Sequence, residues 1–495
     1  MRQNHLHSQK QILQIKPIPI SGHCRPSLCG KPGRMLRLVL ALLIAATTLA
    51  AKGPVYVVLW FDTEDYMEPA ADDAALRIAT DLERLGVRAT FKVVGEKARG
   101  LEARGRRDVI RALGQHDVGY HSNYHSIQPT PALYLRGMGW LDGAAEFERR
   151  ERPGVADIQR IFGVTPSCYG QPGSSWAPQT YRALLRLGIP VYLDEAEHVG
   201  VDGQPFWFGG MLNVFHMGRY LIRPSLDEES QLPQTFEKFD RAAEELEARG
   251  GGVISTYFHP TEFVTSAFWD LNFAKGANPE RADWKNPPRR TAEESERCYR
   301  ILAHYVEHAK ARASVRFITA RELPLLYQSA AVSGVDRAQV ARHMAERQTF
   351  LVTERGALSA ADMLQVLLGM EPAVVEGPVA RGETTYRESS IPRPAFERAK
   401  TDAEGFIRTN RRLPAEVWIG SKKLSLADFA ATLAGDDGAP GAVATRQGNP
   451  EMEKYVATDA TGTFSWPIHP DGFSAPELLE MARLQAWTLK PARLK

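Results

Sequence analysis

The sequence predicts an α/β fold in which strands and helices alternate over residues 54–328. Short apolar runs, typical of buried strands, are separated by longer segments with helical periodicity. Several of the apolar runs end directly in acidic residues or histidines. Because parallel α/β barrels carry their active sites at the carboxyl ends of their strands, this order predicts both the fold class and the position of the site.

The expected elements follow from these apolar runs and periodic segments. The strands are expected at residues 55–61, 89–94, 118–121, 191–193, 253–258 and 315–319. Helices are expected between them, including residues 74–85, 236–248 and 292–311. Strands followed by helices in this way predict a mainly parallel sheet.

A chain of 495 residues is too long for one ordinary domain. We expect a boundary at residues 329–334, where small residues follow the last strand of the 54–328 region. Residues 335–495 are then expected to form a smaller, mainly helical accessory domain. Three helix starts of one type, at Ser359, Ser425 and Ser474, favour this reading because serine is a common helix cap.

The basic excess of the chain lies at its N-terminus. Residues 1–51 hold seven Lys or Arg and no acid, so leaving them out changes the formal charge from +2 to −5. The remaining chain has no basic excess to attract nucleic acid. Residues 35–51 combine Arg37, an apolar core and a small-x-small motif, which together are typical of a secretory signal. We expect an exported protein that is periplasmic, cell-wall associated or extracellular. Residues 1–34 are either a long n-region of the signal or an extension from a start codon placed too far upstream, and we favour the extension.

The cysteines do not predict a framework of disulfide bonds. Cys24 and Cys29 belong to the leader, and a disulfide between Cys168 and Cys298 is compatible with export but not required by it. No paired Cys/His spacing predicts a structural zinc site.

Two histidines four residues apart, His121 and His125, are the most informative feature of the chain. On a helical turn this spacing puts both imidazoles on one face, where they can share a metal ion. A carboxylate from the acidic run that begins at Asp62 would complete a triad with positions open for water and substrate. His259 ends a further expected strand. The order of acid, histidine pair and third histidine predicts a hydrolytic metal site.

Five segments carry a family resemblance. They are Trp60-Phe61-Asp62-Thr63-Glu64-Asp65, a variant of a Phe-Asp-Asp-Gly motif; residues 86–95, similar to a second strand; His121-Ser122-Asn123-Tyr124-His125, an intact His-Ser/Thr-x-x-His motif; residues 254–259, which end in His259; and residues 315–323. In this order they resemble the polysaccharide deacetylases, carbohydrate esterase family four, over residues 54–328. The resemblance implies a distorted (β/α) barrel.

The resemblance also implies a reaction. A divalent metal, zinc being the first candidate, would be held by His121, His125 and a carboxylate. Asp62 would act as general base on an N-acetyl group, and His259 would give a proton to the departing amine.

Three further residues take supporting roles by the same resemblance. Ser122 would brace the metal site. A backbone N–H near Tyr169 would stabilise the oxyanion. Asp194 matches an acid that often supports the catalytic histidine.

Two residues, Glu64 and Asp65, are candidates for the acid that completes the metal site. The usual motif has it directly after the base, where this chain has Thr63. Glu64 corresponds to relatives in which it comes two residues after the base. Asp65 is slightly preferred because of its side-chain type, and both remain candidates.

A second departure concerns the orientation of the base. The family has an arginine that orients the catalytic aspartate, and Gly170 stands in its place here. Another cation replaces the arginine, the base is tuned differently, or catalysis is impaired.

The remaining signals concern glycan contacts. For any one of the tryptophans that could stack on a sugar, core packing is the first expectation, and Trp269 and Trp284 are the best candidates for exposed contacts. Residues 406–420 weakly resemble a pseudomurein-binding repeat, which implies attachment to a cell-wall polymer, with a generic helical appendage as the alternative.

Together these features predict an exported, metal-dependent hydrolase that removes N-acetyl groups from an amino-sugar polymer. Peptidoglycan, a chitin-like chain and an exopolysaccharide all fit as the polymer, and the C-terminal domain is a candidate for binding the cell wall or a glycan. The alternatives are a catalytically weak or inactive glycan-binding protein and an amidase of a small non-sugar substrate. An open groove would favour a polymer, and a closed pocket a small amide.

Overall fold

β1 (Val55–Thr63) is the central strand of the sheet in the computed structural model, which describes residues 52–328 and 334–495. It is buried along almost its whole length, as expected for a parallel strand covered on both faces. β8 (Gly252–Phe258) pairs with one edge of β1. On the other edge, β9 (Val315–Ile318) pairs with the first half and β2 (Thr90–Val93) with the second half.

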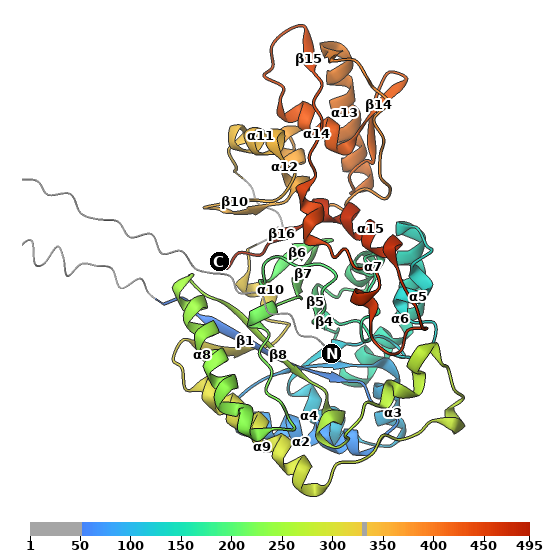
Figure 1. The fold of residues 1–495 in the computed structure, drawn as a ribbon, viewed down its shortest axis with the longest axis vertical. Coiled ribbons are helices and arrows are strands. Elements are labelled where there is room, and N and C mark those ends of the chain that lie inside the picture. Colours follow the sequence, from blue (N-terminus) through green and yellow to red (C-terminus); the bar gives the residue numbers. More distant parts are fainter. Residues whose placement is uncertain (1–51, 329–333) are drawn as a thin grey trace, which may run out of the picture. The chain divides into compact units, whose positions relative to one another are not determined.

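The main sheet has ten strands (Figure 1). Their order is β16 (Lys490–Pro491), β6 (Phe206–Phe208), β7 (Met211–Val214), β5 (Val191–Leu193), β4 (Cys168–Tyr169), β3 (Asp117–Tyr120), β2, β1 and β8, with β9 also on β1. Every pairing from β7 to β8 is parallel, and β6 and β16 are antiparallel. A parallel bridge joins Leu221, after β7, to Ser255 of β8. The sheet therefore curls into an incomplete barrel, and the expected α/β barrel class is confirmed.

The helices of this region follow the strands. They are α2 (Ala70–Arg84), α3 (Gly95–Ala103), α4 (Arg107–Gly114), α5 (Pro131–Leu135), α6 (Trp140–Phe162), α7 (Gln179–Arg186), α8 (Leu232–Ala248), α9 (Ala292–Lys310) and α10 (Leu323–Leu326). The helices α2, α8 and α9 begin and end within a few residues of the expected positions. The largest difference is four residues, at the starts of α2 and α8. α2 starts at Ala70, and Asp72 and Asp73 in its first turn suit the positive end of a helix.

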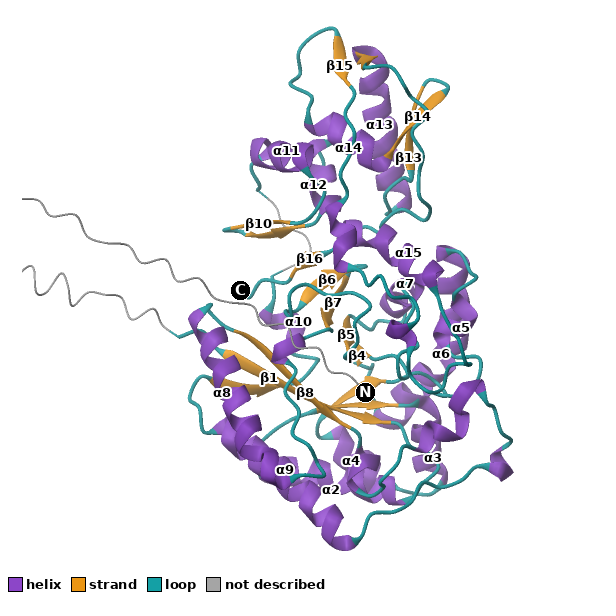
Figure 2. Cartoon of the chain, in the orientation of Figure 1, coloured by secondary structure: helices purple, strands orange, loops and turns teal. Residues whose placement is uncertain are grey.

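The C-terminal region combines helices with three two-stranded sheets (Figure 2). Its elements are α11 (Arg337–Glu346), β10 (Leu351–Thr353), β11 (Gly356–Leu358), α12 (Ala360–Leu367), β12 (Ser390–Pro392), α13 (Arg393–Asn410), β13 (Glu416–Ile419), β14 (Lys422–Ser425), α14 (Leu426–Ala434), β15 (Ala442–Ala444) and α15 (Pro476–Gln485). Ser359 and Ser425 cap α12 and α14. The third expected cap is wrong: Ser474 donates to Ala460 O, and α15 begins at Pro476 without a side-chain cap.

The C-terminal region returns to the barrel. Residues 52–495 belong to one compact unit, and β16 near the C-terminus pairs with β6 of the main sheet. Lys490 of β16 makes a buried 2.6 Å ion pair with Asp362 of α12. Trp140 of α6 donates a 3.1 Å hydrogen bond to Glu376. Residues late in the sequence are thus in direct contact with the barrel.

Other expectations have different outcomes. The expected secretory signal at residues 35–51 lies outside the described residues. Within 52–328 and 334–495, no helix is both long and apolar enough to cross a membrane. Cys168 and Cys298 are buried free thiols, so the disulfide considered between them does not form.

Candidate functional site

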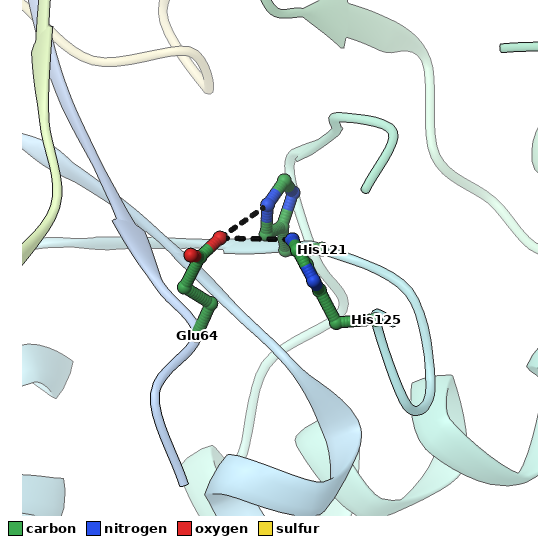
Figure 3. A group of neighbouring side chains, drawn as sticks. All are labelled: Glu64, His121 and His125. Atoms are coloured by element: carbon green, nitrogen blue, oxygen red, sulfur yellow. Dashed lines mark hydrogen bonds and ion pairs between the residues drawn. The ribbon is translucent and has the colours of Figure 1, made fainter. Parts of the chain in front are cut away.

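Three buried side chains, Glu64, His121 and His125, meet beyond the carboxyl ends of β1 and β3 (Figure 3). Nε2 of His121 lies 3.1 Å, and Nε2 of His125 2.9 Å, from Oε2 of Glu64. One ligand atom from each residue lies within 4.8 Å of the other two. Two imidazoles and one carboxylate are a donor set suited to zinc or iron.

The two histidines do not lie on a helical turn, so that part of the sequence interpretation is wrong. His121 continues β3, with its N–H bonded to Val93 O, and a loop follows it. Ser122 and His125 both have left-handed backbone angles, φ 65° and 60°. The Ser122 hydroxyl accepts the His125 N–H at 3.0 Å and so stabilises the turn that brings His125 back beside His121.

The surroundings of the group fit a metal ion. His121 Nδ1 lies 3.1 Å from Gly170 O and donates to it, which leaves Nε2 for a ligand. His125 Nδ1 lies 2.6 Å from the Ser126 hydroxyl, and the buried His125 Nε2 faces Glu64 Oε2 at 2.9 Å without a hydrogen bond of good geometry. Burial alone would raise the pKa of Glu64, but the nearby imidazoles outweigh it and hold that pKa well below its usual value. A metal would bind His125 Nε2 and the ionised Glu64 carboxylate together.

The geometry favours Glu64 over Asp65 as the metal-binding acid. Asp65 Oδ1 accepts the backbone N–H groups of Met67 and Glu68, and its Oδ2 accepts the Thr261 hydroxyl at 2.7 Å. Both Asp65 oxygens are therefore bonded within the protein, whereas Glu64 Oε2 faces both imidazoles. The preference for Asp65 does not agree with this arrangement.

A buried lysine stands where the missing arginine was expected to act. Nζ of Lys92, on β2, lies 2.9 Å from Asp62 Oδ1 and 3.1 Å from Asp194 Oδ2, and it donates to Leu193 O at 2.9 Å. Burial alone would lower the pKa of Lys92, but the charges of Asp194 and Asp62 outweigh it and raise that pKa. Of the alternatives left open by Gly170, replacement by another cation is the one that matches the structure.

Gly170 makes room for this lysine. A Cβ at Gly170 would overlap both Lys92 Nζ and Asp194 Oδ2, and would lie 2.9 Å from Leu193 O. The cation beside Asp62 therefore comes from Lys92 on β2, and the residue that follows β4, Gly170, has no side chain beyond a hydrogen atom. The glycine at position 170 and the lysine at position 92 are therefore explained by one exchange of positions.

His259 is supported by Glu262 and not by Asp194. Glu262 Oε2 lies 3.0 Å from His259 Nδ1 and accepts the His259 backbone N–H at 2.9 Å. Arg223 forms a close ion pair with the other Glu262 oxygen. His259 Nε2 faces Asp62 Oδ2 at 3.7 Å. The expected role of Asp194 belongs to Glu262, and Asp194 holds Lys92 instead.

Trp269, a candidate for an exposed sugar contact, is instead fully buried, and its Nε1 donates to Glu64 Oε1 at 2.9 Å. The Tyr169 side chain is buried in the core, packed edge-on against Tyr192. Gln171, two positions later, lines the site cavity. An oxyanion contact at Tyr169 would therefore come from the backbone alone.

The candidate catalytic and metal-binding residues line a cavity of about 590 Å³. Asp62, Glu64, His121, His125 and His259 all line it. The expected base, metal-binding group and acid thus line one solvent-accessible cavity. The volume of this cavity is typical of small-molecule pockets.

The chain matches no protein-family model and no curated protein sequence. Among solved structures it is similar to a Mycobacterium smegmatis protein assigned as a polysaccharide deacetylase, with 16% identity and a TM-score of 0.35, over 56% of this chain and 91% of that one. It is also similar to the Xyl-CE4 domain of a multidomain xylanase from the hindgut metagenome of Trinervitermes trinervoides, with 15% identity and a TM-score of 0.29, over 55% and 89%. A third is Puue allantoinase, with 14% identity and a TM-score of 0.37, over 55% and 90%. Polysaccharide deacetylases are therefore among the structures it resembles, and a likeness at these values assigns neither reaction nor substrate.

Proposed function

We propose that this protein is a metal-dependent hydrolase that removes an N-acetyl group from an amino sugar outside the cytoplasm. The observation that carries the proposal is the position of Asp62. Its Oδ1 lies 3.5 Å from His121 Nδ1, at the metal-binding group, and its Oδ2 lies 3.7 Å from His259 Nε2. A base, a metal-binding group and an acid on one cavity are the parts needed to hydrolyse an amide.

Each residue has one task in this proposal. Glu64, His121 and His125 would hold a divalent metal, with zinc the first candidate for two imidazoles and one carboxylate. When bound, the metal supplies Lewis-acid activation of the amide carbonyl. Asp62, oriented by Lys92, takes a proton from the attacking water.

His259 completes the reaction by donating a proton to the departing amine nitrogen. Burial alone would lower the pKa of His259, but the charges of Glu64 and Glu262 outweigh it and raise that pKa to about 9. The imidazole is therefore protonated at neutral pH and ready to donate. Glu262 fixes the ring through Nδ1, so that Nε2 is the atom that faces the cavity.

The substrate class and location are supported by the sequence. The ordered motifs of residues 54–328 favour an N-acetylated saccharide, and the signal-like residues 35–51 favour export. The segment 406–420 favours contact with a cell-wall polymer.

Two variants of the full chain test the proposal. His121→Ala is expected to lose metal and acetate release together, whereas Asp62→Asn is expected to keep metal and lose acetate release by about 10²–10⁴-fold, the usual contribution of a general base. Acetate is measured with N-acetylglucosamine oligomers and peptidoglycan, and metal by elemental analysis.

Asp117→Asn is the matched control. Asp117 is a buried barrel aspartate at the start of β3, bonded to Ser167 and Arg321 and away from the cavity. Its loss is expected to affect stability and to leave turnover per folded molecule unchanged. Full acetate release by Asp62→Asn would show that the base is assigned wrongly.

A further inference from the structure

A segment of the C-terminal region crosses to the site cavity. Residues 459–473, here called the strap, are fixed to barrel loops by backbone groups. Trp466 N–H donates to the Ser174 hydroxyl at 3.0 Å, and Pro467 O accepts the Lys275 N–H at 2.7 Å. Ile468 O accepts from the Gln128 side chain at 2.8 Å. Three separate loops of the barrel therefore hold the strap in place.

The Trp466 side chain is fixed as well. Its Nε1 donates to the buried Asp270 Oδ2 at 2.7 Å, and its ring packs edge-on against Phe268 with centroids 5.8 Å apart. Asp270 directly follows Trp269, which binds Glu64. The indole is therefore tied to the loop that also supports the metal-binding group.

A barrel loop leaves space for the indole. Gly173 has a left-handed backbone, φ 53°, and a Cβ there would lie 2.6 Å from Trp466 Cγ, inside van der Waals contact. A residue with a side chain would be strained at this φ and would also displace the ring. The barrel and the strap are thus fitted to each other at the cavity.

The strap lines the same cavity as the catalytic residues. Trp466, half-buried, borders it together with Thr463 and Ser465. Phe268 lies between the strap and the proposed acid, because its ring also packs edge-on against His259 at 4.8 Å. Aromatic faces and hydroxyl groups therefore lie side by side next to the reacting centre, a combination suited to the apolar faces and polar edges of a sugar ring.

We propose that the strap is part of the substrate site and that Trp466 binds the sugar, so that the C-terminal region selects short saccharides or chain ends. The proposal rests on the function proposed above and narrows its substrate. Pockets of about 300–1,000 Å³ enclose small ligands, and the cavity of about 590 Å³ falls in that range. Because the strap forms one wall of the cavity, we expect it to admit an N-acetylated sugar that has few adjacent sugar units. Binding of an interior unit of a long polymer is expected to be weaker.

The test compares Trp466→Ala and Trp466→Phe with Tyr386→Ala in the full chain. Tyr386 is the matched control because it is also a partly exposed aromatic residue of the C-terminal region, and it belongs neither to the cavity lining nor to residues 406–420. Acetate release is measured on N-acetylglucosamine oligomers of increasing length, and metal content is measured for every variant. Calorimetry with N,N′-diacetylchitobiose gives the Kd without requiring turnover.

Wild type is expected to show no gain in kcat/KM beyond short oligomers. Trp466→Ala is expected to raise the KM and Kd for the disaccharide on the order of tenfold, the scale of losing one buried aromatic contact, with metal content and kcat nearly unchanged. Trp466→Phe keeps an aromatic face and is expected to stay closer to wild type, and Tyr386→Ala is expected to match wild type. Long oligomers are expected to gain relative to the disaccharide in Trp466→Ala.

The outcomes separate the two proposals. If Trp466→Ala releases acetate with the KM, the Kd and the length preference of wild type, the proposed role of the strap is wrong. The proposal of a hydrolase is not affected by that result. Disaccharide binding that depends on Trp466 without acetate release supports the strap and contradicts the hydrolase. Wild type that does not bind the disaccharide overturns the role of the strap.

Discussion

Replacing Lys92 by methionine removes the buried ammonium that lies between Asp62 and Asp194. Methionine preserves most of the side-chain volume beside Trp60, whose ring lies 4.0 Å from Lys92 Nζ. The two carboxylates then face each other without the 2.9 Å and 3.1 Å ion pairs. Leaving a buried charge without its partner costs about 3–5 kcal/mol, so we expect a loss of about 3 kcal/mol in the free energy of unfolding at neutral pH.

Part of this loss is expected to disappear in acid. Burial raises the pKa of Asp194, and Lys92 is the charge that opposes this shift. Without Lys92, the folded variant binds a proton at Asp194 more readily than the unfolded chain does. For an acid with a raised folded pKa, stability falls as pH rises, so the variant should lose least relative to wild type at low pH.

Catalysis is expected to suffer more than stability. Without the ammonium, Asp62 has no fixed orientation toward the attacking water, and kcat should fall by about 10²–10³-fold, within the range for a misplaced general base. Metal content should stay at the wild-type level because Lys92 does not touch Glu64, His121 or His125. The assay pairs acetate release with metal analysis and urea unfolding.

Lys490→Met is the control for this experiment. Lys490 is also a buried lysine, paired with Asp362 at 2.6 Å, and it lies outside the cavity lining. A similar loss of stability with unchanged kcat is expected. Wild-type kcat in Lys92→Met, with full metal content, would refute the reasoning that Lys92 replaces the missing arginine.

Three further predictions concern groups around the site and the strap. Glu262→Gln removes a charge that raises the pKa of His259, so the alkaline limb of the kcat–pH profile should move to lower pH; an unmoved limb would contradict the pairing. Trp269→Phe removes the hydrogen bond to Glu64 and should weaken metal affinity by about 10–100-fold in a chelator competition, whereas unchanged affinity would show that the bond is dispensable. Burial lowers the pKa of His198 to about 3, so its contribution to stability should be complete above its usual value of 6.5 and fall by about 2 kcal/mol at pH 5. His198→Phe should flatten this part of a pH series of urea unfolding curves, and an unchanged slope would contradict it.

The sequence was informative wherever chemistry followed directly from a strand. Asp62 and His121 could be placed because β1 and β3 are apolar runs that end at polar residues, and parallel strands bring their carboxyl ends together. The order of the motifs along residues 54–328 predicted the barrel. Lys92 and Glu262 also left local signals: a lysine inside a buried strand needs a partner, and an acid three residues after His259 can cap its turn.

Other features could not be read from local pattern. The spacing of His121 and His125 fits a helix, but two residues at positive φ produce the same approach in a loop. Trp466 lies far along the chain from Gly173, and only the folded chain shows that one leaves room for the other. Tertiary contacts of this kind have no sequence period to reveal them.

The most direct test of the central claim is a metal titration of the full chain after chelation, with acetate release from N,N′-diacetylchitobiose as the readout. Activity is expected to rise with added zinc and to stop rising at one equivalent. Asp62→Asn is expected to bind the same equivalent without releasing acetate. Acetate release that is independent of metal, or a protein that takes up no metal at all, would contradict the claim that Glu64, His121 and His125 form the catalytic metal site.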